Sequence, residues 1–180
     1  MYCRLMEETL SEARGETVRP ELTTRVDLRV DAFLPEEYIR DDRQRMEMYR
    51  RVAAVQSDAD REDILDELID RFGDTPAVVD SLLDVSQLRY LCSRAGIVHV
   101  QHREDKLVMR LDPSYVPDPF LLVQAMQKAS PKLTITQGMP ASMILKDVRG
   151  TDVDALHQGL KVMRRLCEEL DRLQNEKKEA

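Results

Sequence analysis

Residues 64–73 read Ile-Leu-Asp-Glu-Leu-Ile-Asp-Arg-Phe-Gly, which is the pattern of an amphipathic helix with a defined end. At about 100° per residue, the apolar side chains of this stretch fall on one side of the helix; they are Ile64, Leu65, Leu68, Ile69 and Phe72. Gly73 supplies the left-handed residue that ends such a helix. Thr75-Pro76 then predicts an N-cap followed by proline at the first helical position. The pattern therefore predicts a helical hairpin.

The opposite side of this helix is acidic; it carries Asp63, Asp66, Glu67 and Asp70. Residues 57–72 hold seven acidic and two basic side chains, a net charge of −5, whereas the whole chain carries −7. A solvated helix face is the ordinary interpretation of such a row. The sharper interpretation is a docking surface for a basic partner.

Three blocks of the chain have the order and spacing of a known family. They are Leu-Pro-Glu-Glu-Tyr-Ile-Arg-Asp-Asp-Arg-Gln-Arg at 34–45, Met-Tyr-Arg-Arg-Val-Ala at 48–53 and Glu-Leu-Ile-Asp-Arg-Phe-Gly at 67–73. On these blocks the chain resembles the C-terminal domain of bacterial transcription-repair coupling factor, most specifically from Leu22 to Ile97. One departure is Asp74-Thr75, where the family often has a more apolar pair, and it affects only the turn.

The resemblance implies a regulatory role within an ATP-driven DNA translocase of transcription-coupled nucleotide excision repair. A domain of this family is expected to dock on the N-terminal module that binds the repair protein UvrA. By masking that module, it would hold the translocase autoinhibited until it engages stalled RNA polymerase. The resemblance names this module of the same parent chain as partner, and UvrA, RNA polymerase and double-stranded DNA as partners of the parent. The implied partner-binding residues are Asp63, Asp66, Glu67 and Asp70.

The resemblance also divides the chain. Residues 1–15 are expected to be the tail helix of an upstream motor lobe, 16–21 a linker, and 22–180 the C-terminal regulatory domain. From the pattern we expect an α+β fold: a three-helix layer over about 41–95 beside a small antiparallel sheet, with a helix over 152–174 packed across it. The expected strands span 22–30, 97–111 and 132–148. A short helix is expected at 119–129.

Composition describes an ordinary globular protein, with 42% hydrophobic and 34% charged residues. No apolar run approaches the ~20 residues of a membrane span. The three cysteines, Cys3, Cys92 and Cys167, have unrelated spacings, so we expect reduced thiols in a cytoplasmic protein. A pI near 5.1 argues against a general nucleic-acid binder, which needs a basic face.

The competing function is a nucleic-acid-binding accessory domain that uses the arginine-rich segment 40–51. Its five arginines, Arg40, Arg43, Arg45, Arg50 and Arg51, lie beside Tyr38 and Tyr49. Five acidic residues in 36–47 cancel their charge, which favours solvated ion pairs.

Motifs of catalysis and of cofactor binding do not occur in the sequence. It has no phosphate-binding glycine loop, no nucleophile elbow and no HExxH pair. His99 and His102 lie three apart on an expected strand and so point to opposite faces, which disfavours a shared metal ion. We therefore expect no enzyme activity, no cofactor and no metal in this chain, whose parent would carry the ATPase motifs.

Overall fold

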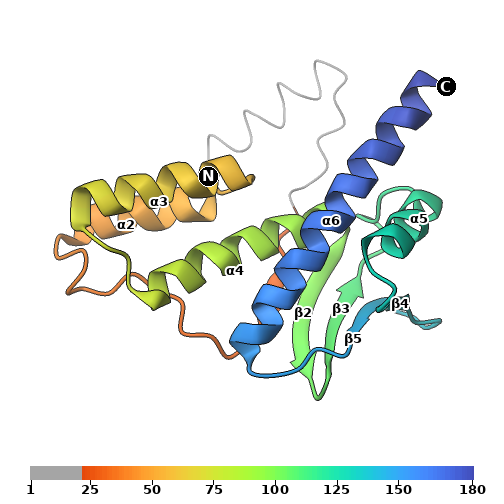
Figure 1. Cartoon of the computed structure of the whole chain (residues 1–180), viewed down its shortest axis with the longest axis horizontal. Coiled ribbons are helices and arrows are strands. Elements are labelled where there is room, and N and C mark those ends of the chain that lie inside the picture. Colours follow the sequence, from red (N-terminus) through yellow and green to blue (C-terminus); the bar gives the residue numbers. More distant parts are fainter. Residues whose placement is uncertain (1–21) are drawn as a thin grey trace.

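The computed structural model describes residues 22–180, in which five helices and a five-stranded sheet form an α+β fold (Figure 1). The helices are α2 (Asp42–Ala53), α3 (Asp58–Phe72), α4 (Ala77–Arg94), α5 (Pro119–Ala129) and α6 (Asp152–Glu179). The strands are β1 (Arg25–Asp27), β2 (Ile97–Arg103), β3 (Lys106–Leu111), β4 (Leu133–Ile135) and β5 (Ser142–Lys146). The predicted fold class is confirmed. The expected tail helix at 1–15, the linker at 16–21 and Cys3 lie outside the described residues.

The sheet has the order β1-β2-β3-β5-β4, and it is mixed where we expected antiparallel pairing throughout. The pairs β2–β3, β3–β5 and β4–β5 are antiparallel, whereas β1 pairs with β2 in parallel. Three helices separate β1 from β2, and such a long crossover returns the chain in the parallel direction. The alternation of apolar and polar residues along β1 does not indicate whether the strand pairs in a parallel or an antiparallel direction.

β1 is also much shorter than the strand expected over 22–30. Its last paired residue is Asp27, and the backbone N–H of Arg29 donates to the carboxylate of Asp152 at 2.5 Å. Leu28 and Val30 still pack against the main core. The alternating apolar pattern over 22–30 therefore indicates which residues pack against the core, but only three residues of the segment pair with another strand.

Two hydrophobic cores share α4, which runs from the helical layer to the sheet (Figure 1). Val79 and Leu83 belong to the smaller core between α2, α3 and α4. Leu88, Leu91 and Cys92 belong to the larger core against the sheet. This single helix therefore fixes the position of the α2–α3 pair relative to the rest of the domain.

The turn between α3 and α4 begins as the sequence predicts. Gly73 follows α3 with a φ of +88°, in the region that favours glycine. The next cap differs by one residue, because the N-cap of α4 is Pro76 and not Thr75. The Thr75 hydroxyl donates instead to the carboxylate of Asp80 at 2.9 Å.

The inward face of α2 is rotated from the one we expected. The apolar spacing of this segment favours Met46, Tyr49, Val52 and Ala53 as the inner side. In the structure Met48 and Val52 are buried, and Tyr49 packs against the smaller core. Met46 is 54% exposed, and Ala53 is also exposed. The Ser86 hydroxyl of α4 donates to the Val52 carbonyl at 2.6 Å, which fixes the side of α2 that meets α4.

α6 begins with a capping box, in which the side chains of Thr151 and Asp154 each accept a hydrogen bond from the other's backbone N–H. Its apolar stripe lies in the main core from Leu156 to Leu170, so the stripe is covered within the chain. The helix continues to Glu179, beyond the end that we expected at residue 174. Arg172 pairs with Glu176, and Lys177 pairs with Asp118 near α5, which supports this last turn.

Candidate interaction surface

The acidic side of α3 divides into residues that are exposed and residues that are held by neighbours. Asp63, Asp66 and Asp70 are exposed, on the side of α3 away from the buried Ile64 and Leu68. Within residues 22–180, no basic group lies within ion-pair distance of these three carboxylates. We call these three residues the α3 acidic face. Their charges are not compensated by any basic group of residues 22–180.

Glu67 differs from the other three predicted residues because two arginines hold it. Its carboxylate accepts from Arg71 of the same helix at 2.8 Å and pairs with Arg51 of α2. Hydrogen bonds from Arg51 and then from Arg71 lower the pKa of Glu67 below its ordinary value. The structure thus places Glu67 at the α2–α3 contact, beside the α3 acidic face. The i,i+4 spacing could have identified Arg71, but Arg51 comes close only through the fold.

The start of α3 is also tied to the rest of the domain. Asp58 accepts from Gln87 of α4 and pairs with Arg164 of α6 at 3.3 Å. Arg61 pairs with Asp84 at 2.8 Å. These contacts join the N-terminal end of α3 to α4 and α6, and they hold the α3 acidic face in a fixed orientation.

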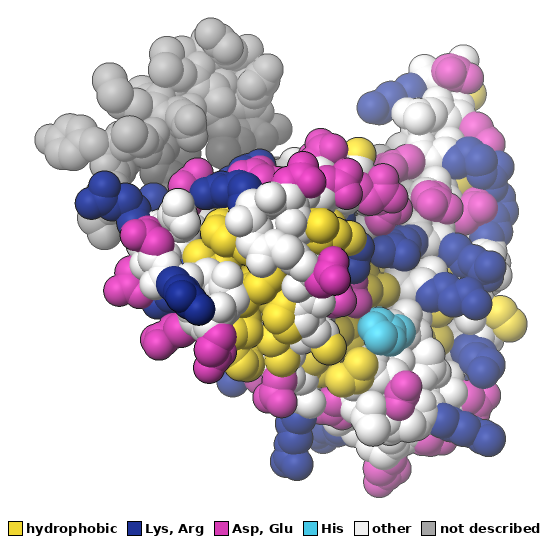
Figure 2. Space-filling view, turned by 60° about the vertical axis from the view of Figure 1, so that its left-hand side comes forward, with side chains coloured by type: hydrophobic (Ala, Val, Ile, Leu, Met, Phe, Trp, Pro, Cys, Tyr) yellow, Lys and Arg dark blue, Asp and Glu magenta, His cyan; other side chains and the backbone are white. Residues whose placement is uncertain are grey.

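Apolar side chains lie beside this acidic face. Ile69 is 40% exposed, and Leu65 and Phe72 are partly exposed on the same helix. Figure 2 shows acidic side chains along the upper edge of this side of the molecule, with an area of hydrophobic side chains below them. An exposed apolar area with a charged rim is the usual composition of a protein interface.

The arginine-rich segment 40–51 does not form a continuous basic surface. Arg45 donates to the carbonyl of Ile39 and to Asp42, and Arg51 pairs with Glu67. The others, Arg40, Arg43 and Arg50, are exposed among acidic residues of the same segment. The ion pairs that we expected from the sequence account for two of the five arginines.

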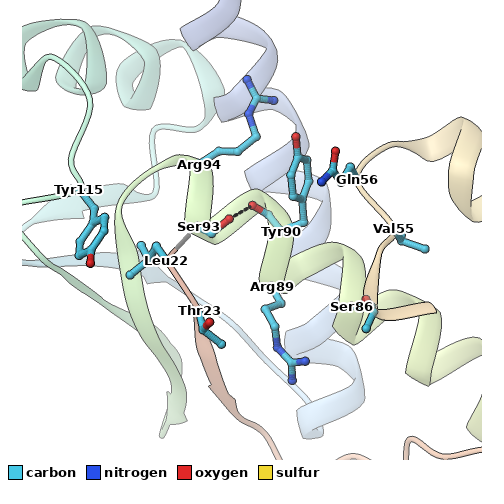
Figure 3. A pocket seen from close by; sticks show the side chains of 11 residues that line it. Leu22, Thr23, Val55, Gln56, Ser86, Arg89, Tyr90, Ser93, Arg94 and Tyr115 are labelled. Atoms are coloured by element: carbon cyan, nitrogen blue, oxygen red, sulfur yellow. Dashed lines mark hydrogen bonds between the residues drawn. The ribbon is translucent and has the colours of Figure 1, made fainter. Parts of the chain in front are cut away.

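A cavity of about 530 Å³ lies beside α4, between the α2–α3 connection and the segment before β1 (Figure 3). Its polar lining includes Arg89, Arg94, Tyr90 and Tyr115. Arg94 pairs with Asp171 of α6, and the Ser93 hydroxyl donates to the Tyr90 carbonyl at 2.7 Å. The described lining holds hydroxyl groups and two arginines but no carboxylate, histidine or thiol.

His99 and His102 have carboxylate partners, and the two thiols of the described chain are buried. His99 contacts Asp27 at 2.8 Å, and His102 contacts Asp152 at 2.7 Å, so the two imidazoles meet different carboxylates. Across residues 22–180, no group of three metal-ligating side chains gathers in one place. Burial raises the pKa of the Cys167 thiol to about 11, and it raises that of Cys92 as well. A catalytic thiol needs the opposite shift.

Comparison with known proteins gives consistent matches. The family model described as the TRCF domain matches residues 28–120, just over half of the chain. A transcription-repair-coupling factor of Mycobacterium bovis is 41% identical over 129 residues, which cover 66% of this chain and 10% of that protein. The Bacillus subtilis transcription-repair-coupling factor is 31% identical over 112 residues, which cover 62% of this chain and 9% of the relative.

A solved structure shares the fold. The crystal structure of the C-terminal domain of a transcription-repair coupling factor aligns with a TM-score of 0.73 at 23% identity. The alignment covers 87% of this chain and 99% of that one. The chain spans about a tenth of the length of the curated relatives that it matches. No helix within the described part of the chain is long and apolar enough to cross a membrane.

Proposed function

Because the chain belongs to the TRCF domain family, as a C-terminal domain of transcription-repair coupling factor, we propose that it regulates a longer coupling factor by docking. In this proposal the domain covers the UvrA-binding module of the same parent chain. It thereby holds an ATP-driven translocase inactive until the translocase engages stalled RNA polymerase. The partners of the parent are then UvrA, RNA polymerase and double-stranded DNA. These partners affect this domain through its release from the module.

The observation that carries this proposal is the α3 acidic face. Asp63, Asp66 and Asp70 have no basic neighbour within ion-pair distance in residues 22–180, and Ile69 is exposed beside them. Such a surface favours a partner that presents arginines around an apolar side chain, because its charges are uncompensated until the partner arrives. Glu67 borders this surface and would contribute a fourth carboxylate, already shared with Arg51 and Arg71.

The rigidity of the surface supports docking as the mode of action. α3 is tied to α2 through Glu67, to α4 through Arg61 and Asp84, and to α6 through Asp58 and Arg164. A preorganised surface loses little conformational entropy on binding. We propose that catalysis resides in the parent and that this domain acts by contact alone.

The direct test is binding of the 180-residue chain to the isolated UvrA-binding module, measured by isothermal titration calorimetry. The variant Asp63→Asn with Asp66→Asn and Asp70→Asn is expected to bind about tenfold more weakly or worse, since charge pairs desolvated at an interface are worth a few kcal/mol. Its melting temperature should stay within about 2 °C of the original, because none of the three side chains makes an internal ion pair in the described structure.

The matched control removes the same charge elsewhere. Asp31, Glu168 and Glu179 are exposed acidic residues outside α3, and none is ion-paired in the described part of the chain. The variant Asp31→Asn with Glu168→Gln and Glu179→Gln should bind the module like the original. Equal affinities of both variants and the original would refute the α3 acidic face as the docking surface.

A further inference from the structure

Positive charge gathers in one part of this acidic chain. Residues 128–165 carry seven basic and three acidic side chains, a net charge of +4, whereas the whole chain carries −7. One of the seven, Arg164, turns toward Gln87 and Asp58 on the side of the helical layer. The remaining six bases lie in the sequence around α5, β5 and α6.

Four of these bases line a single hollow of about 220 Å³. The hollow lies between the C-terminal end of α5, the end of β5 and one side of α6, and its basic lining residues are Lys132, Lys146, Lys161 and Arg165. The α6 residues that line it are Gln158, Lys161, Val162 and Arg165, at i, i+3, i+4 and i+7. The helix therefore presents one continuous face to the hollow, which we call the basic hollow.

The charge of the basic hollow is largely uncompensated. Lys132 lies 3.8 Å from Asp147, which is the only carboxylate in the described lining. Among the described residues, no carboxylate lies within ion-pair distance of Lys146, Lys161 or Arg165. Four cations around one carboxylate leave a net positive site that favours an anion.

We propose that the basic hollow binds backbone phosphates of a nucleic-acid duplex. The lining contains three lysines and one arginine but no aromatic side chain, so it lacks the stacking surfaces that single strands use. Lysine binds phosphate as a point charge, and contacts of this kind position a protein on a duplex without reading its sequence. The site therefore takes double-stranded DNA of any sequence.

The location of this site makes it independent of the α3 acidic face. In Figure 1, α5, β4 and β5 lie at the opposite end of the molecule from α2 and α3, with α4 and α6 between them. A partner docked on α3 leaves the basic hollow open. The inference therefore goes beyond the proposed docking function, and either one can fail alone.

The test is fluorescence anisotropy of the 180-residue chain with a fluorescein-labelled duplex of mixed sequence, about 25 base pairs long, across a series of NaCl concentrations. If four phosphates are neutralised, the slope of log K against log[NaCl] is about −3.6, which is about a fifty-fold loss of affinity from 50 to 150 mM. The variant Lys132→Gln, Lys146→Gln, Lys161→Gln with Arg165→Gln should lose most of this slope and bind at least about tenfold more weakly at 50 mM.

Two further variants make the result specific. Replacing the three lysines by arginine keeps the charge and should keep the affinity. Replacing Arg40, Arg43, Arg50 and Arg110 by glutamine removes the same charge from exposed sites outside the basic hollow and should leave binding unchanged. Equal loss in this control would overturn the proposal, because net charge alone would then explain binding. Displacement of the duplex by unlabelled poly-glutamate at an equal concentration of charge would also overturn the proposal, because the site would then accept an acidic peptide equally well.

Discussion

Glu67 shows how one residue can belong to a surface pattern and still have an internal role. Its position on the helix places it with Asp63, Asp66 and Asp70, but Arg51 and Arg71 turn its carboxylate toward α2. A helix pattern predicts the angle at which a side chain leaves the helix. It does not predict which neighbouring element brings a partner to that angle, and this is why the four predicted residues fall into two groups.

The first prediction concerns the stability that Glu67 provides. Glu67→Gln should lower the melting temperature by about 1–3 °C at pH 7, since a partly exposed pair is worth up to about 1 kcal/mol. Because the pKa of Glu67 is lowered in the folded state, its contribution is present above the unfolded pKa and is lost as pH falls through the folded one. Thermal melts should therefore show a difference from the original at pH 7 that shrinks as the pH is lowered toward 3. A difference that persists unchanged at pH 3 would contradict this origin.

The second prediction concerns Asp152, which joins three segments. Its carboxylate accepts from the backbone N–H of Arg29 and contacts His102, and these contacts lower its pKa, the Arg29 bond most. Asp152→Ala should lower the melting temperature by about 3–6 °C, equivalent to about 1–2 kcal/mol, since β2 and the segment that follows β1 each lose a charged hydrogen bond. The stabilisation is present above the unfolded pKa and disappears as pH falls through the folded one. The control Asp154→Ala removes only the capping contact with Thr151 and should lower the melting temperature by less than Asp152→Ala does. An Asp152→Ala effect no larger than the control's would show that Asp152 acts only as a helix-terminal charge.

At the scale of elements, the sequence predicts best where one helix buries one side. α3, α4, α5 and α6 lie where their apolar periodicity places them, although the N-cap of α4 is Pro76 and α6 extends to Glu179, and the hairpin of β2 and β3 spans the expected residues. Two features could not be predicted. The direction of β1 depends on a crossover that sequence alternation does not record, and the rotation of α2 depends on the Ser86 contact across the helical layer.

The third prediction concerns the junction between α4 and β2. Gly96 has a φ of +78°, and a Cβ there would lie 2.7 Å from the backbone of Val116. Gly96→Ala should therefore destabilise the domain by about 2–3 kcal/mol, or about 5–10 °C in melting temperature. The matched control is Gly138→Ala, because Gly138 has open space and no positive φ. Similar melts for both variants would contradict the close approach at Gly96.

The net charge of the whole molecule does not reveal that it has two surfaces of opposite charge. The α3 acidic face comes from one stretch of sequence, so the sequence alone could propose it. The basic hollow combines Lys132, Lys146 and Lys161 with Arg165, from three separate segments, and a pI near 5.1 argues against any nucleic-acid site. Only the fold brings these residues together, so chain-averaged charge could not identify them.

The fourth prediction concerns catalysis. The purified chain should hydrolyse no ATP, with or without duplex DNA, because we expect the ATPase motifs in the parent and not in this domain. A coupled phosphate-release assay measures this, with the full-length parent as positive control. Turnover that co-purifies with the chain through several columns, and that scales with its concentration, would contradict the assignment of a purely regulatory domain.

In the proposed function, the α3 acidic face holds a longer coupling factor closed. Its most direct test is UvrA binding by the full-length parent without ATP, with Asp63→Asn, Asp66→Asn and Asp70→Asn introduced into this domain. We expect UvrA to bind the variant in a pull-down but not the unaltered parent, while both retain the same melting temperature. A variant that stays as unable to bind UvrA as the unaltered parent would contradict the claim.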